Sequence, residues 1–138
     1  MTDIKLTHTF LYSPDQDAAV DFYTSVLGLE VRTDVVMEGI GMRWLTVGAP
    51  GQPELEINLM NPDDVPQPPE AVETVKRLTA DGAIGTLIFA VPDCQATFDE
   101  VKASGAPVTQ EPVKQPYGVI DCGFRDPNGN HVRFSQVL

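Results

Sequence analysis

The chain carries one pattern of residues twice, and this internal repeat limits the folds that it can adopt. Residues 8–15 (HTFLYSPD) precede a stretch with helical spacing that ends near Gly28. Residues 86–93 (TLIFAVPD) precede a second such stretch that ends near Gly105, and the two Pro-Asp pairs lie 78 residues apart. Two copies at so long a period indicate a duplicated module rather than a solenoid. The seam between two such modules is where we expect a binding cavity.

The first copy predicts a βαβββ module over residues 4–60. Alternation from Ile4 to Tyr12 predicts a strand, with the even-numbered residues on one face. Pro14 and Asp15 predict the start of a helix, and Gly28 its end. Three further strands, separated by glycine turns, are expected over residues 29–36, 42–47 and 54–60.

The second copy predicts the same module over residues 84–137, after a connecting segment at 61–82. The proline-rich residues 61–69 predict a linker, and residues 70–80 a short helix. The expected elements of the second module are a strand at 86–91, a helix at 94–104, and strands near 107–110, 119–124 and 131–136. The sequence therefore predicts one α+β domain over residues 1–138, built from two tandem modules.

Charge and composition exclude several classes of partner. The net charge is −11 and the pI about 4.3, so the surface has little with which to neutralise phosphates. We therefore expect neither nucleic acid nor a membrane as a partner. The two cysteines make no disulfide framework, and from the sequence we expect neither a signal peptide nor a transmembrane segment. A cytoplasmic location is the expectation.

Two motifs resemble one known superfamily. Residues 22–31 (FYTSVLGLEV), together with residues 126–130 (DPNGN), resemble the vicinal oxygen chelate proteins, which include glyoxalase I, bleomycin resistance proteins and extradiol dioxygenases. The resemblance extends over residues 4–136, and residues 116–118 with 124–127 resemble its smaller glyoxalase-like members. It implies paired βαβββ modules that curl a mixed sheet around a shared cleft, and usually a homodimer.

The same resemblance implies four positions for a metal ion, occupied here by His8, Glu56, Thr86 and Arg133. Imidazole and carboxylate ligate divalent metals, whereas threonine is a poor ligand and arginine a permanent cation. Two suitable ligands fall short of about three, the number in an open catalytic site. We therefore expect no metal cofactor. Zinc, nickel, iron or manganese remains the alternative, with His131 as the third ligand.

Without a metal, these residues take on other roles. We predict an ion pair between Glu56 and Arg133, because a carboxylate buried in a cleft needs a cationic partner. His8 and Glu56 are the catalytic candidates, as general bases. The predicted ligand-binding residues add aromatic, apolar and polar side chains, and flat organic molecules suit Trp and Tyr. They are Phe10, Trp44, Met60, Thr86, Tyr117 and Arg133, with core packing as the other interpretation of Phe10 and Met60.

Three functions remain in competition because fold alone does not choose between them. The preferred one is binding of a small organic molecule, such as a metabolite or antibiotic, without chemistry. The second is a metal-dependent lyase or dioxygenase that uses His8 and Glu56 as metal ligands. The third is a metal-free enzyme in which His8 or Glu56 acts as a general base.

Overall fold

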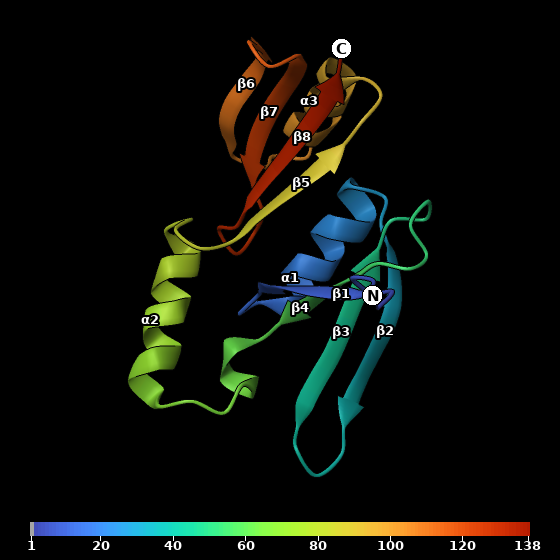
Figure 1. Ribbon diagram of the computed structural model, residues 1–138. Coiled ribbons are helices and arrows are strands. Elements are labelled where there is room, and N and C mark those ends of the chain that lie inside the picture. Colours follow the sequence, from blue (N-terminus) through green and yellow to red (C-terminus); the bar gives the residue numbers. More distant parts are fainter. Residues whose placement is uncertain (1) are drawn as a thin grey trace. The chain divides into compact units, whose positions relative to one another are not determined.

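A computed structural model describes residues 2–138, which form two compact units that divide between Lys76 and Arg77 (Figure 1). The division falls within helix α2 (Pro69–Ala80), so the unit boundary lies inside the predicted connecting helix. A short 3₁₀ turn, Pro62–Asp64, comes before that helix in the chain. The helix begins at Pro69, one residue earlier than expected, because proline is tolerated in the first helical turn.

The first unit contains a complete βαβββ module. Its strands are hydrogen-bonded in the order β1-β4-β3-β2, with β1 parallel to β4 and the other pairs antiparallel. The helix after β1 ends in a π-helical turn, Phe22–Val26, and Gly28 follows it at φ +75°. The elements are β1 (His8–Tyr12), α1 (Gln16–Asp21), β2 (Glu30–Met37), β3 (Met42–Gly48) and β4 (Glu56–Met60).

The second unit repeats this topology and confirms the duplicated module. Its strand order is β5-β8-β7-β6, again with the first strand parallel to the last and antiparallel pairs elsewhere. Two four-stranded mixed sheets therefore make an α+β fold of tandem modules. The elements are β5 (Thr86–Ala90), α3 (Cys94–Ala103), β6 (Val108–Gln115), β7 (Val119–Arg125) and β8 (His131–Val137).

The repeated Pro-Asp pair has the same structural role in both modules. Asp15 is the N-cap of α1 and accepts a hydrogen bond from the Ala18 amide at 2.9 Å. Asp93 is the N-cap of α3 and accepts one from the Ala96 amide at 3.0 Å. Each carboxylate satisfies a backbone N–H that the first helical turn leaves unpaired. The signal in the sequence thus marks the residue before each helix rather than its first turn.

Helix α1 packs against the first sheet and helix α3 against the second. In the first unit Tyr23, Leu45 and Leu59 are fully buried in the resulting core. In the second, the Phe124 ring lies 5.3 Å from the Phe98 ring and 6.1 Å from the Phe134 ring. We call the opposite surface of each sheet its open face.

Two predicted strands differ from the structure by four residues or more, and the others by two or fewer. β1 begins at His8 rather than Ile4, and Ile4 is 87% exposed, because its partner β4 begins only at Glu56. β6 extends to Gln115 rather than Gln110. It contains Pro112, which removes a backbone donor, but β6 is an edge strand and its register shifts between Gln110 and Val113.

Candidate functional site on the open sheet faces

The first open face brings together five of the predicted site residues. Successive side chains of a strand point to opposite sides, and Leu11, Leu45 and Leu59 point into the core. The residues that alternate with them therefore share the open face. These are His8 and Phe10 on β1, Trp44 and Thr46 on β3, and Glu56, Asn58 and Met60 on β4.

A short polar chain crosses this face. His8 and Glu56 are register partners on the parallel strands β1 and β4, and His8 Nε2 lies 3.5 Å from Glu56 Oε2. The buried Thr46 donates its hydroxyl to Glu56 Oε1 at 2.7 Å. The His8 side chain is 44% exposed and that of Glu56 25%. A carboxylate held on one side by Thr46 thus orients an accessible imidazole, the arrangement that a general base or a metal ligand requires.

Aromatic and apolar side chains surround that polar chain. The His8 and Trp44 ring centroids lie 6.2 Å apart, and Phe10 meets Tyr12 edge to face at 5.1 Å. Phe10 is 50% exposed, so it is not a core residue of its own unit. Val35 and Met37 on β2 are exposed too, opposite Trp44 and Met42 in register. Exposed apolar side chains gathered on one sheet face are typical of a surface that binds a ligand or another protein.

The second open face is polar at its centre. Arg133 on β8 donates from Nη2 to Gln110 Oε1 at 3.0 Å, and the same Nη2 lies 3.4 Å from Asp121 Oδ2 on β7. Asp121 is buried, and its Oδ1 accepts hydrogen bonds from Gln110 Nε2 at 2.7 Å and Gln115 Nε2 at 3.0 Å. Three side chains thus satisfy one buried carboxylate, as burial of a charge requires.

These contacts set the protonation of Asp121. Burial acts to raise its pKa, but the hydrogen bonds from Gln115 and Gln110 and the positive charge of Arg133 outweigh burial. The pKa of Asp121 therefore lies below the usual value for an aspartate. The group is an anion at neutral pH and forms a fixed ion pair with Arg133.

A hollow of about 430 Å³ opens beside this ion pair. Arg133, Asp121 and both glutamines lie on its polar side. Ile88, 69% exposed, and Tyr117, 71% exposed, lie on its apolar side. Val119 and Ser135 complete the lining. The predicted ligand residues Arg133 and Tyr117 thus meet at one hollow within the second unit.

The sequence analysis did not identify three residues of this hollow, Asp121, Gln110 and Gln115. Their signal was the carboxylate within the otherwise apolar run of residues 119–124, since a buried carboxylate needs partners. Thr86, predicted to bind ligand, is an exposed residue at the start of β5 and is not part of the hollow.

The strand registers correct the expected equivalence of Glu56 and Arg133. His8 pairs with Glu56, and its counterpart Thr86 pairs with His131. His131 is therefore the counterpart of Glu56. Phe10 pairs with Asn58 and Ile88 with Arg133, so Arg133 corresponds to Asn58. The position that the family resemblance gave to Arg133 thus differs by two residues from the register counterpart of Glu56.

The candidate metal ligands form no complete set within the described part of the chain. Residues 2–138 contain no group of three or more His, Cys, Asp or Glu side chains arranged to hold a metal ion. Glu56 contacts His8 and Thr46, whereas Arg133 contacts Asp121 and Gln110, each within its own unit. The predicted Glu56–Arg133 ion pair joins different units and remains a prediction.

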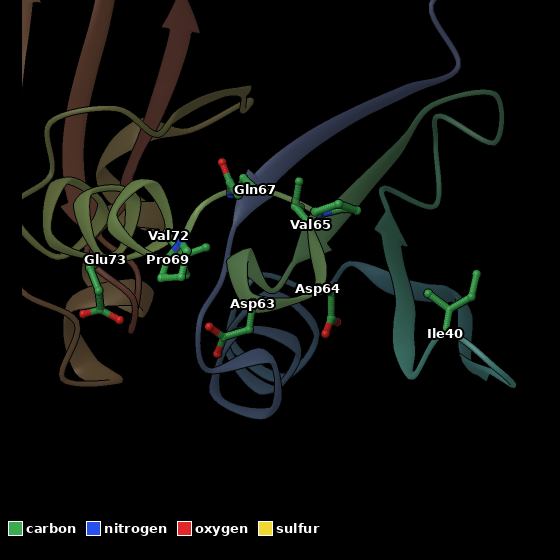
Figure 2. A pocket seen from close by; sticks show the side chains of 9 residues that line it. Ile40, Asp63, Asp64, Val65, Gln67, Pro69, Val72 and Glu73 are labelled. Carbon is green, nitrogen blue, oxygen red and sulfur yellow. The ribbon is translucent and has the colours of Figure 1, made fainter.

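A second hollow, of about 520 Å³, lies in the first unit between residues 63–73 and the β2–β3 turn at Ile40 (Figure 2). Its carboxylates are occupied by protein groups. Asp63 pairs with Lys76 at 2.9 Å, and Asp64 accepts a hydrogen bond from the Arg43 amide at 3.3 Å. These contacts hold the connecting segment, and the charge of Asp63 is paired with Lys76.

Comparison with known proteins gives the family. Residues 5–134 match the Glyoxalase/Bleomycin resistance protein/Dioxygenase superfamily, and the chain belongs to that superfamily. The crystal structure of UcmS2 is similar, with 34% identity, a TM-score of 0.88, and coverage of 97% of this chain and 98% of UcmS2. TnmS3, an antibiotic binding protein from Streptomyces sp. CB03234, shares the fold at 24% identity and a TM-score of 0.76, covering 100% of this chain and 99% of TnmS3.

A curated relative bears an enzyme name. The probable lactoylglutathione lyase of Vibrio cholerae is 27% identical over 142 residues, which cover 99% of this chain and 93% of the relative. Residues 2–138 include no helix that is long and apolar enough to cross a membrane.

Proposed function

We propose that this protein binds a small organic molecule on the open faces of its sheets and needs no catalytic metal to do so. The observation that carries the proposal is the first open face, where Trp44 and the half-exposed Phe10 surround the accessible His8. Aromatic bodies with polar tips suit a flat, partly polar ligand. TnmS3, described as an antibiotic binding protein, gives one precedent for binding on this fold.

The residues present favour binding without a metal. His8 and Glu56 are adjacent potential ligands, but two protein ligands are fewer than the roughly three of an open catalytic site. Arg133 adds a permanent cation to the second face, where it is already paired with Asp121. We further propose a cytoplasmic homodimer, with neither nucleic acid nor membrane as partner, in keeping with the net charge of −11.

One observation favours a second function. The register makes His131 the counterpart of Glu56, so each unit offers a ligating side chain at the same position. A metal-dependent lyase or dioxygenase would use His8, Glu56 and His131 as ligands of zinc, nickel, iron or manganese. The name of the Vibrio cholerae relative agrees with this alternative.

The test screens aromatic compounds against protein dialysed with EDTA. Thermal shift detects ligands, and Trp44 fluorescence reports binding at the first face, because the chain has a single tryptophan. We expect saturable stabilisation and a change in Trp44 fluorescence without added metal. The matched variant Phe10→Ala should weaken binding, while Ile4→Ala, at an exposed residue before β1, should not. Ligands that bind only after a metal is restored would favour the enzyme.

A further inference from the structure

The polar side of the hollow in the second unit is fixed before any ligand arrives. Asp121 on β7 is contacted by three side chains. Gln110 and Gln115 lie on β6 and Arg133 lies on β8, the two strands that pair with β7. The guanidinium of Arg133 is consequently held by side chains of two other strands, Asp121 on β7 and Gln110 on β6. Groups positioned in this way lose little conformational entropy when they bind a ligand.

Gly123 makes room for that guanidinium. A Cβ at Gly123 would lie 2.9 Å from Arg133 Nη1 and 2.6 Å from Thr109 Oγ1. Arg133 and Gly123 are register partners on β8 and β7, so the guanidinium crosses the sheet where its neighbour has no side chain. The glycine therefore lets Arg133 lie along the floor of the hollow rather than extend into water.

Arg133 retains free hydrogen-bonding capacity. Its Nη2 makes both described contacts, to Gln110 and Asp121, and among residues 2–138 no acceptor is found for Nη1 or Nε. Guanidinium N–H groups donate only, so they call for an acceptor on the ligand. A ligand oxygen in the hollow would accept a hydrogen bond from one of these N–H groups of Arg133.

The charge balance indicates which acceptor fits. Asp121 already neutralises Arg133, and it lies buried 3.4 Å from the guanidinium nitrogen. A ligand carboxylate would bring a second anion next to Asp121 in a chain of net charge −11. Like charges that close repel, so an uncharged acceptor is favoured over an anion. Ile88, Val119 and the Tyr117 ring supply apolar contact for the rest of the ligand.

We infer that this hollow binds the carbonyl end of an uncharged aromatic or aliphatic organic molecule, with the carbonyl oxygen accepting a hydrogen bond from Arg133. This inference rests on the proposed binding function and names the ligand chemistry of one part of the site. The apolar body of the ligand packs on Ile88, Val119 and Tyr117.

Three probes that share one ring system test the inference. They are 2-acetylnaphthalene, which carries a ketone, 2-ethylnaphthalene, which carries no acceptor, and 2-naphthoate, which carries a carboxylate. Dissociation constants are measured by calorimetry on the full chain. We expect the ketone to bind about tenfold more tightly than the ethyl compound, as one hydrogen bond to a charged donor allows, and more tightly than the carboxylate.

Two variants assign the preference to Arg133. Arg133→Met should reduce the ratio of ketone to ethyl affinity to about one, because the donor is lost while the apolar stem remains. Asp121→Asn keeps the guanidinium but removes its neutralising charge, so 2-naphthoate should become the tightest of the three probes. Ile4→Ala, at an exposed residue before β1 and outside both open faces, should leave the ratio unchanged.

The outcomes separate this inference from the proposed function. If ketone and ethyl compound bind equally to the unaltered protein, the carbonyl inference is wrong and the binding function stands. If 2-naphthoate binds tightest to the unaltered protein, the hollow is an anion site and the inference is likewise wrong. If none of the three binds while other organic molecules from the wider screen do, the inference alone fails. If no organic molecule binds at all, both fail. Should Arg133→Met not fold, Asp121→Asn alone decides, since an unchanged order of affinities would contradict the inference.

Discussion

The two sheets share one topology and differ in chemistry at corresponding positions of their open faces. Where the first has Asn58, the second has Arg133, and Thr46 corresponds to Gly123 through the pairings of these residues. Two residues earlier on the same strands, Trp44 corresponds to Asp121. The core faces stay apolar in both units. Core packing therefore maintains the module, while residues on the open face are free to become aromatic in one copy and charged in the other.

The charged face depends on a set of linked residues rather than on one substitution. Arg133 needs the space at Gly123, and Asp121 needs the donors of Arg133 and two glutamines. The first face has no such dependence, since His8 and Glu56 reach water and their contacts are fewer. We therefore expect mutations on the second face to cost more stability than their counterparts on the first.

Arg133→Met should produce the largest effect. It leaves the buried carboxylate of Asp121 without its cation, and loss of one partner of a buried pair costs about 3 kcal/mol. Urea unfolding measures the loss. Asn58→Met, at the counterpart position, should cost less than about 1 kcal/mol, because Asn58 makes no described side-chain hydrogen bond. Equal losses at the two positions would refute the contrast between the faces.

The double variant Arg133→Met with Asp121→Leu should recover most of the lost stability. Replacing both charges leaves no buried ion without a partner, and apolar replacements of buried pairs are often neutral. The same urea titration shows whether the double variant is more stable than Arg133→Met alone. If it is less stable, the cost of the single variant comes from lost packing and not from the unpaired Asp121.

Gly123→Ala should have the next largest effect, about 2 kcal/mol of destabilisation. Its Cβ would displace the ends of Arg133 and Thr109, and overpacking of this kind costs about 1–3 kcal/mol. Gly51→Ala is the control, because nothing lies within 4 Å of a Cβ there. Thermal unfolding compares the two variants, and similar melting temperatures would mean that Arg133 relocates without cost.

Thr46→Val on the first face should cost about 1 kcal/mol. It removes the 2.7 Å hydrogen bond to Glu56, whose carboxylate remains partly in contact with water. The change in the free energy of unfolding should be smaller than that for Gly123→Ala at the counterpart position. A larger value would show that the first face is as tightly linked as the second.

The smallest expected effect is the contribution of Asp121 to the pH dependence of the free energy of unfolding. The folded state lowers its pKa, so its contribution is full above the unfolded value of about 3.9 and is lost as pH falls through the lower folded pKa. The free energy of unfolding should therefore fall below about pH 4 more steeply in the unaltered protein than in Asp121→Asn. Parallel curves would mean that the surrounding donors do not favour the anion.

The sequence predicted the fold through signals that are local. The repeated Pro-Asp pair, Gly28 and the alternating strands identified both modules, because capping and alternation depend on near neighbours. The start of β1 was wrong because strand length depends on the partner β4. The π-helical turn at Phe22–Val26, where the adjacent Phe22 and Tyr23 are both buried, was not foreseen.

The site was predicted in part for the same reason. Alternation placed His8 with the other even-numbered residues of its strand, and residues 131 and 133 on one face of theirs, whereas Glu56 was suggested by the family resemblance. It did not distinguish His131 from Arg133 as the counterpart of Glu56, because residues two apart share a face. Nor did it pair Arg133 with Asp121, since that contact depends on the β7–β8 register and on the absence of a side chain at Gly123.

The central claim, organic ligand binding without a metal, is tested most directly by one titration. The affinity of 2-acetylnaphthalene is measured by calorimetry on EDTA-dialysed protein, then again after zinc, nickel, iron(II) or manganese is added. We expect the same dissociation constant, within about twofold, in every case. Binding that appears only with a metal, and that is lost in His8→Ala and His131→Ala, would contradict the claim and identify a metal-dependent enzyme.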